Sequence, residues 1–237
     1  MERIERGGGS AGPRGRAGIR PQPVYPVCLD LRGRLCVVAG GGGVAERKAR
    51  GLLSAGARVV VVAKSAGAGI ERMARAGRIA LRRRGFAASD LDGAFLCVAA
   101  TGDAASNRAA ALACKGRGVL VNAADSPPLC DFFLPAVVSR GALRIAVSTG
   151  GASPALAKRL REEIGRRYGP EYGALVDLAA RMRPRLLARL PAGERAAVFS
   201  RLAGPSVLRA LRRGGKAAAR REMGRILAGE AGRGGRR

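Results

Sequence analysis

Short apolar runs alternate with amphipathic segments along the first half of the chain. Residues 35–39 are an apolar run that ends at four consecutive glycines, and residues 44–55 place apolar side chains at helical spacing. A second run, Arg58 followed by four valines and an alanine, is apolar on both faces, as expected for a strand covered on both sides by helices. The pattern therefore predicts a strand, a tight turn, a helix and a second strand, which together form a βαβ unit.

The same alternation continues through the next sixty or so residues. It predicts, in order, a helix over 69–77, a short strand near 79–82, a strand over 94–99, a helix over 104–116 and a strand over 119–122. Strands that alternate with helices in this way are typical of a parallel, doubly wound sheet. We therefore expect a Rossmann-type domain over residues 23–124.

Beyond that domain the pattern changes. Two strand-like runs at 132–138 and 142–148 flank a glycine turn and predict a hairpin. Ser153-Pro154 then marks the beginning of a helix that ends by Gly169-Pro170, because serine is a good N-cap and proline suits the first helical position. We expect residues 125–170 to form a small α+β segment.

The remaining part of the chain has a helical pattern. Over residues 171–228, apolar residues recur at helical spacing, with interruptions expected at Pro184, Pro191 and Gly204-Pro205. The predicted fold class is therefore α/β: a Rossmann-type parallel sheet domain, a small α+β segment and a C-terminal helical region. The glycine- and arginine-rich ends offer too little apolar surface to offset the entropy of ordering, and we expect disordered basic tails over 1–22 and 229–237.

Charge restricts the partners only in part. The chain carries 44 lysines and arginines against 17 acidic residues, a formal net charge of +27, which attracts polyanions of any kind. Aromatic residues make up only 3% and no nucleic-acid reading motif is present, so nucleic acid is not the expected partner. No run approaches the roughly 18 apolar residues of a membrane span, and the first residues lack the apolar core of a signal peptide. We expect a cytoplasmic protein that contacts no membrane.

The residue types that are missing restrict the chemistry. Histidine is absent, so a general base has to come from Asp, Glu, Lys, Tyr or Cys. The five cysteines show no C-x-x-C spacing, which indicates neither a zinc site nor a disulfide framework. No bound metal is expected.

One motif points to a cofactor. Gly40-x-Gly42-x-x-Ala45 follows the first strand and opens the first helix, which is the setting of a dinucleotide-binding fingerprint. The first glycine permits the tight turn, the second lets the backbone approach a pyrophosphate, and the small third residue lets the helix pack on the strand. Backbone N–H groups at the start of the helix would then face the phosphates of a nicotinamide dinucleotide.

The end of the second strand departs from the usual NAD pattern. Ala63-Lys64-Ser65 stands where an acidic residue would normally hold the ribose hydroxyls of NAD. Lys64 could instead favour the 2′-phosphate of NADP, so the preference between the two coenzymes stays open. Lys64 and Ser65 are candidate ribose contacts.

Asp125 is a candidate for proton chemistry. It comes three residues after the last strand of the predicted sheet, at the edge where open α/β folds place their ligands. A carboxylate there can accept a proton or steer a cation. An aspartate before Ser126-Pro127 is also common turn chemistry, and its position alone leaves both interpretations open.

Several separated motifs occur together in one known family. In chain order they are Tyr25-Pro26-Val27, Leu31-Arg32-Gly33-Arg34, the run from Gly40 to Lys48, Val98-Ala99-Ala100-Thr101, Asn107, the run from Val121 to Asp125 and the run from Ser148 to Pro154. With these motifs the chain resembles the precorrin-2 dehydrogenase and sirohydrochlorin ferrochelatase module of siroheme synthases, over roughly residues 24–190. It looks like a stand-alone form of that module, without the methyltransferase domain of the fused enzymes.

The resemblance implies an activity and an assembly. The activity is the NAD-dependent oxidation of precorrin-2 to sirohydrochlorin in siroheme biosynthesis, followed in some members by insertion of ferrous iron. The substrate is a tetrapyrrole that carries many carboxylates, which an arginine-rich protein would attract. Family members form homodimers through the segment that follows the Rossmann domain.

The resemblance also implies residue roles. It places Gly43 and Val44 along the phosphates of the cofactor, Lys64 and Ser65 near its adenosine, and Asp125 on the catalytic aspartate. The expected cofactor-binding residues are Gly40, Gly42, Gly43, Val44, Lys64, Ser65, Thr101 and Asn122.

Two other functions are compatible with the residues. A redox regulator would bind NADH yet fail to oxidise precorrin-2. A basic nucleic-acid-binding protein would ignore NAD and would bind in a steeply salt-dependent way.

Overall fold

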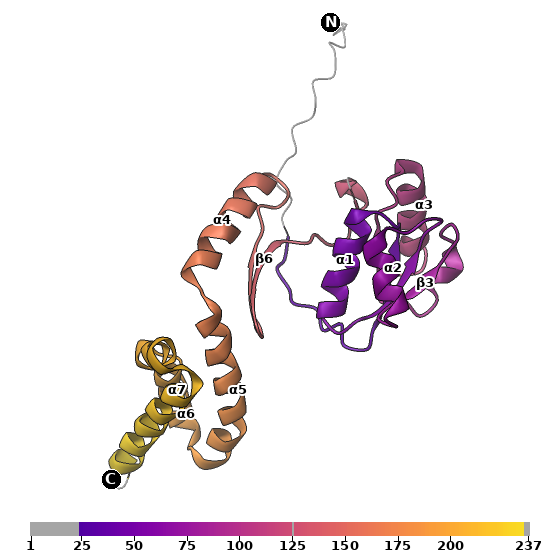
Figure 1. Cartoon of the computed structure of the whole chain (residues 1–237). Helices are drawn as coiled ribbons and strands as arrows, with labels where there is room; N and C mark the ends of the chain where they lie inside the picture. Colours follow the sequence, from indigo (N-terminus) through magenta and orange to yellow (C-terminus); the bar gives the residue numbers. More distant parts are fainter. Residues whose placement is uncertain (1–23, 125, 235–237) are drawn as a thin grey trace, which may run out of the picture. The chain divides into compact units, whose positions relative to one another are not determined.

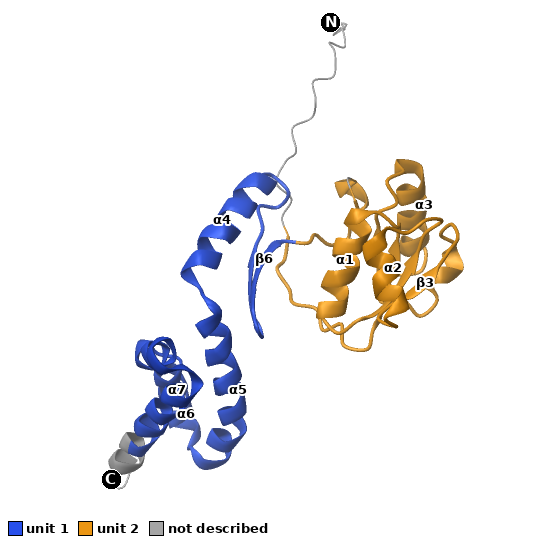
Figure 2. Cartoon of the chain, viewed as in Figure 1, with its two compact units in different colours: residues 1–23, 135–237 blue, residues 24–134 orange. Residues whose placement is uncertain are grey.

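The structure of the chain, a computed structural model, describes residues 24–124 and 126–234, with side chains as far as residue 228 (Figure 1). The predicted tail at 1–22 lies outside the described residues. Two compact units make up the chain, Val24–Leu134 and Pro135–Arg237 (Figure 2). Each unit has its own apolar core.

A parallel sheet of five strands forms the centre of the first unit. The strands are β1 (Leu35–Ala39), β2 (Arg58–Val62), β3 (Ala80–Arg82), β4 (Leu96–Ala99) and β5 (Leu120–Ala123). Their order in the sheet is β3-β2-β1-β4-β5, so the direction of winding reverses between β1 and β4. Open α/β sheets bind their ligands at the carboxyl ends of the strands at such a reversal.

Helices cover both faces of this sheet (Figure 1). The helices α1 (Gly43–Ser54) and α2 (Ala68–Arg75) pack on one face and α3 (Ala104–Lys115) on the other. Neighbouring residues of β1 divide between the two layers, since Val38 belongs to the cluster with α1 and Val37 to the cluster with α3. Because both faces are covered, β1 is apolar throughout, and the predicted Rossmann-type fold is confirmed.

Three of the cysteines belong to this core. Cys36, Cys97 and Cys114 are buried, whereas Cys28 is exposed. Burial raises the pKa of the Cys36 thiol to about 11, so this group stays protonated at neutral pH. Cys36 therefore serves as a small apolar side chain.

The second unit begins with the predicted hairpin and capped helix. Strands β6 (Ala136–Arg140) and β7 (Leu143–Val147) pair antiparallel, and α4 (Pro154–Arg167) follows. The Ser153 hydroxyl accepts the N–H of Leu156 at 3.3 Å, as expected of an N-cap.

The first strand of this hairpin begins later than residue 132, where the sequence pattern predicts it. The chain before β6 is still bound to β5: Asp131 N–H donates to Val121 O at 2.8 Å, and the Asn122 amide donates to Phe132 O at 2.9 Å. These bonds keep residues 131–132 with the sheet, and the compact first unit extends to Leu134 rather than 124. Between β5 and β6 lies a short 3-10 turn, η2 (Pro127–Leu129).

Three helices complete the second unit: α5 (Pro170–Arg189), α6 (Ala192–Leu202) and α7 (Pro205–Gly234). The stops expected at Pro191 and at Gly204-Pro205 are confirmed. The interruption expected at Pro184 is wrong, because α5 continues through this residue. Leu178 and Leu186, on either side of the exposed proline, are buried in one cluster with α6 and α7, and this packing outweighs the backbone hydrogen bond that a proline removes.

A break that the pattern does not predict lies inside α7. Gly214 and Gly215 have non-helical backbone angles, with φ of +61° at Gly215, a conformation that favours glycine. The helix also extends to Gly234, beyond the end predicted at residue 228, while residues 235–237 lie outside the described part. Within the described residues, no helix has both the length and the apolar character to cross a membrane.

Candidate functional site

The glycine turn between β1 and α1 is held against two other loops of the sheet. Gly40 has φ of +126°, and a Cβ there would lie 2.1 Å from the carbonyl oxygen of Ala100, after β4. A Cβ on Gly41 would lie 1.8 Å from the carbonyl oxygen of Ser65, after β2. Both distances are far below van der Waals contact, so these two glycines are needed for the loops to meet.

The next two glycines face open space. A Cβ on Gly42 or Gly43 would meet nothing within 4 Å. Gly42 is the N-cap of α1, and no side chain caps this helix. The first backbone N–H groups of a helix have no partner within the helix, and the helix dipole adds a partial positive charge there. The turn therefore offers main-chain donors to an anionic group that approaches Gly42 and Gly43.

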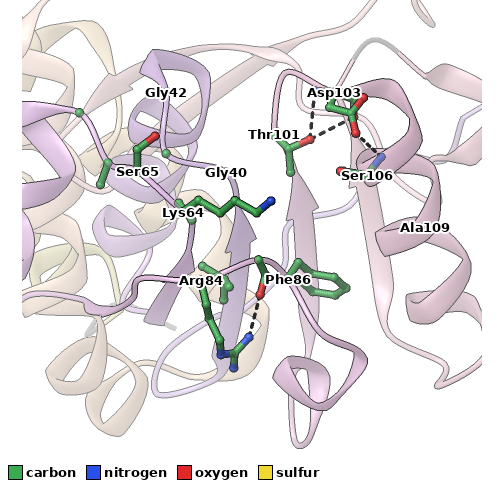
Figure 3. Close-up of a pocket in the computed structure, with 16 residues that line it drawn as sticks. Gly40, Gly42, Lys64, Ser65, Arg84, Phe86, Thr101, Asp103, Ser106 and Ala109 are labelled. Atoms are coloured by element: carbon green, nitrogen blue, oxygen red, sulfur yellow. Dashed lines mark hydrogen bonds between the residues drawn. The ribbon is translucent and has the colours of Figure 1, made fainter.

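A large cavity opens over this turn (Figure 3). Its volume is about 950 Å³, within the range of pockets that hold cofactor-sized ligands. Predicted site residues in its wall are Gly40, Gly42, Lys64, Ser65 and Thr101. The structure thus brings together, in one cavity, residues from the carboxyl ends of β1, β2 and β4.

A smaller cavity of about 270 Å³ shares two wall residues, Gly42 and Thr101, with the large one. Gly43 and Val44, both predicted site residues, line it. Its wall also includes Ala124 and Ser126, at the carboxyl end of β5. The glycine turn therefore lies between two adjoining cavities.

One predicted site residue is placed differently. Asn122 is buried and does not line either cavity; its amide donates to Phe132 O and so fixes the chain after β5. Asp125 lies outside the described residues. Cys130 Sγ accepts the N–H of Ala123 at 3.2 Å, which ties the end of β5 to η2.

The loop between β4 and α3 is fixed by a side chain for which the sequence suggests no role of its own. Asn107 is 5% exposed, and its Oδ1 accepts the Thr101 N–H at 3.0 Å and the Thr101 hydroxyl at 2.9 Å. Asp103 caps α3 by accepting the N–H of Ser106 at 2.8 Å, and its hydrogen bonds with Ser106 lower the pKa of the carboxyl. Thr101 is therefore held in place in the wall that both cavities share.

A buried carboxylate organises the far wall of the large cavity. Asp90, whose side chain is 0% exposed, accepts two hydrogen bonds from Arg84, at 2.6 and 2.7 Å, one from the Ala87 N–H at 2.8 Å and another from Arg82. Burial alone would raise the pKa of Asp90, but the hydrogen bonds from Arg84, Ala87 and Arg82 outweigh it and lower the pKa to about 2. The cluster fixes the segment that carries Arg84 and Phe86 into the cavity wall.

Sequence reasoning missed Arg84, Phe86 and Ser106 as wall residues. Lys64 and Ser65 were predicted because they follow a parallel strand, β2. Arg84 and Phe86 follow β3, so the same position after a strand could have indicated them as well. The described residues contain no group of three or more Cys, Asp or Glu side chains that could hold a metal ion.

The open glycines, the uncapped helix and the adjoining cavities fit a dinucleotide. The pyrophosphate would lie on the N–H groups at Gly42 and Gly43, where a Cβ would project into the space it needs. The nucleotide halves would extend into the two cavities that share Gly42 and Thr101.

Comparisons with known proteins agree with this geometry. A family model described as "Putative NAD(P)-binding" matches residues 27–136, and one described as "Sirohaem biosynthesis protein central" matches residues 140–167. The solved structure of "SirC, precorrin-2 dehydrogenase" is 31% identical and superposes with a TM-score of 0.69, covering 86% of this chain and 100% of that one. The chain belongs to the precorrin-2 dehydrogenase family.

The chain is also similar to siroheme synthases. The siroheme synthase of Methylococcus capsulatus is 46% identical over 166 residues, which is 70% of this chain and 35% of that enzyme. The siroheme synthase of Methylobacillus flagellatus is 38% identical over 209 residues, which is 86% of this chain and 44% of that enzyme. The chain thus spans less than half the length of these relatives.

The different surroundings of Gly41 and Gly42 predict different effects of a single methyl group. Gly41→Ala should lower the free energy of unfolding by about 3 kcal/mol, because its Cβ meets the Ser65 carbonyl. Gly42→Ala should leave stability nearly unchanged but weaken NADH binding by about tenfold or more, roughly 1.4 kcal/mol, because its Cβ enters the cavity. Urea unfolding and NADH fluorescence titration measure the two effects. Equal loss of stability in both variants would contradict this division of roles.

The Asp90 cluster predicts a pH-dependent contribution to stability. The pKa of Asp90 is about 2 in the folded chain, below the value of about 3.9 in an unfolded one, so its contribution is full above about pH 5 and is lost as the pH falls toward 2. Asp90→Asn should lower the free energy of unfolding by about 2 kcal/mol at pH 7, and the difference from wild type should shrink steadily below pH 4.

The matched control for this experiment is Asp92→Asn. Asp92 is 72% exposed in its side chain and lies 3.7 Å from the Arg117 guanidinium, so its removal should cost less than about 1 kcal/mol. Urea titrations of the three proteins between pH 7 and pH 3 give the comparison. A constant difference between Asp90→Asn and wild type across that range would be incompatible with the depressed pKa.

Proposed function

We propose that this chain oxidises precorrin-2 to sirohydrochlorin with a nicotinamide dinucleotide, a step of siroheme biosynthesis. The observation that carries the proposal is the match to a precorrin-2 dehydrogenase over that protein's whole length. The open glycine turn lies within residues 27–136 of this chain, which match the NAD(P)-binding family model. The siroheme synthases, which match 70% and 86% of the chain, are named for the same biosynthesis.

The chain's own residues would bind and orient the cofactor. The N–H groups at the start of α1 would hold the pyrophosphate, Lys64 and Ser65 would contact the adenosine half, and Thr101 would lie between the two halves. When bound, NAD supplies the acceptor for a hydride ion. The hydrogen-bonded loops around the glycine turn keep these contacts in place before a ligand arrives.

The oxidation removes a hydride and a proton from the substrate, so the proton needs an acceptor. We assign this role to Asp125, because the chain has no histidine and because the residues on either side of Asp125, Ala124 and Ser126, line the smaller cavity next to Gly43. A carboxylate at the end of β5 would take the proton as the hydride leaves. The net charge of +27 suits a substrate with a rim of carboxylates.

Insertion of ferrous iron into sirohydrochlorin is a further proposed activity of the same site. Metal insertion releases two protons from the pyrrole nitrogens of the macrocycle, and the carboxylate of Asp125 would accept a proton in this step too. Iron is then a substrate of this reaction.

The proposal predicts that Asp125→Asn separates binding from chemistry. With enzymatically generated precorrin-2 and NAD under anaerobic conditions, the variant should lose at least about 100-fold in turnover, since general-base catalysis contributes 10²–10⁴-fold. Its affinity for NADH should stay within a factor of a few. NADH and sirohydrochlorin absorbance report the first reaction, and added ferrous iron reports the second.

The control for this assay is Asp92→Asn, an exposed aspartate outside both cavities, which should keep wild-type turnover. Unchanged turnover in Asp125→Asn would remove this residue from the mechanism. Wild-type protein that binds NADH but never oxidises precorrin-2 would instead be a redox regulator.

We also propose that the chain forms a homodimer through its hairpin segment. The sheet of the second unit has only β6 and β7 in the part of the chain that is described, and two strands alone are marginally stable. Val137 on β6 and Leu156 on α4 are each 40% exposed, an arrangement that suits cover by a second copy.

The dimer is expected to have twice the mass of the 24.4 kDa chain in sedimentation equilibrium. Val137→Arg should shift it toward the monomer by placing a charge in the apolar contact. Leu112→Arg, on the 54% exposed Leu112 of α3, is the matched control and should leave the mass unchanged. A wild-type protein that sediments as a monomer would refute the dimer.

A further inference from the structure

Two basic side chains, Lys64 and Arg84, belong to the wall of the large cavity (Figure 3). Lys64 comes two positions after the end of β2 and Arg84 two positions after the end of β3. Their surroundings differ in a way that bears on which dinucleotide the cavity accepts.

The guanidinium of Arg84 is already engaged in hydrogen bonds within the wall. Its guanidinium donates two hydrogen bonds to Asp90, and one of its nitrogens lies 2.9 Å from the Gly85 carbonyl oxygen. Asp90 is fully buried, so it holds the guanidinium firmly. Arg84 thus stabilises the wall of the cavity.

Lys64, in contrast, has an uncommitted charge. It is exposed, and among the described residues it makes no ion pair or hydrogen bond. Figure 3 shows its side chain extending from the β2 end into the cavity. The acidic residue in the cavity wall is Asp103, which comes from the β4–α3 side and is engaged with Ser106.

The main chain on both sides of Lys64 is fixed next to the glycine turn. Before it, Gly40 N–H donates to Val62 O at 2.8 Å and Ala63 N–H donates to Arg82 O at 3.0 Å. After it, Gly67 N–H donates to Gly41 O at 2.9 Å. The segment therefore has a set position beside the place of the pyrophosphate.

In this fold, the residue at the end of the second strand contacts the adenosine ribose. An acidic side chain there accepts hydrogen bonds from the ribose hydroxyls and repels a 2′-phosphate, whereas a nearby cation accommodates the phosphate. Lys64 occupies this place and Ser65 adds a hydroxyl donor, since both line the cavity. A hydrogen bond from an ammonium group to a phosphate is charge-assisted and about twice as strong as a neutral one.

We propose that Lys64 and Ser65 form a subsite for the 2′-phosphate of a nicotinamide dinucleotide, so that the chain accepts NADP as well as NAD. This inference rests on the proposed function, because it concerns the same cofactor site. Arg82 and Arg84 take no direct part, because Asp90 holds both of them.

The experiment compares ligands that differ only in the 2′-phosphate. Isothermal titration calorimetry of the full chain at low salt would use 2′,5′-ADP against 5′-AMP, and NADP against NAD. The wild type should bind 2′,5′-ADP at least about tenfold tighter than 5′-AMP, a preference that shrinks as salt is added. Lys64→Met should abolish most of this preference, and Lys64→Glu should reverse it.

Lys216→Glu is the matched control, since it changes the net charge of the chain equally but lies in α7, in the other compact unit. It should retain the wild-type preference, and circular dichroism checks that every variant is folded. The same loss of preference in Lys216→Glu as in Lys64→Glu would assign the effect to overall charge and overturn the subsite.

Two further outcomes separate this inference from the proposed function. A wild type that binds NAD but gains nothing from a 2′-phosphate overturns the subsite and leaves the proposed function standing. A wild type that binds none of the four ligands overturns the proposed function, and the subsite with it.

Discussion

The close approach of three main-chain loops at the carboxyl ends of β1, β2 and β4 is the constraint on which the site depends. The carbonyl groups of Ala100 and Ser65 occupy the space that side chains at Gly40 and Gly41 would need. The next two residues, Gly42 and Gly43, meet no such contact and line the cavities. One short run of glycines therefore serves two purposes, assembly of the loops in its first half and access for a ligand in its second.

Much of the first unit could be predicted from the sequence because its signals are local. Apolar runs such as residues 59–63 have the length of a strand and lack polar positions, as expected for a strand that is buried on both faces. Part of the cavity wall could also be predicted, because residues that follow a parallel strand lie at the ligand-binding edge of the sheet. Lys64, Ser65 and Thr101 were predicted in this way.

The missed features depend on contacts between residues far apart in the chain. Pro184 predicts a break, yet α5 continues because Leu178 and Leu186 are packed against other helices. The strand expected from residue 132 begins later because residues 131–132 bond to β5. The roles of Asp90 and Asn107 could not be predicted from the sequence, because each depends on which polar groups the fold brings within hydrogen-bonding distance.

The three core thiols have a consequence for how the sheet's motion can be observed. Cys36 lies on β1, Cys97 on β4 and Cys114 on α3, all without solvent contact. Burial raises the pKa of the Cys36 thiol, and a protonated thiol is a poor nucleophile. An alkylating reagent can reach them only when the strands separate. The rate at which these thiols are alkylated therefore measures how often the domain opens. If a cofactor bound at the glycine turn stabilises the closed domain, its addition slows this alkylation.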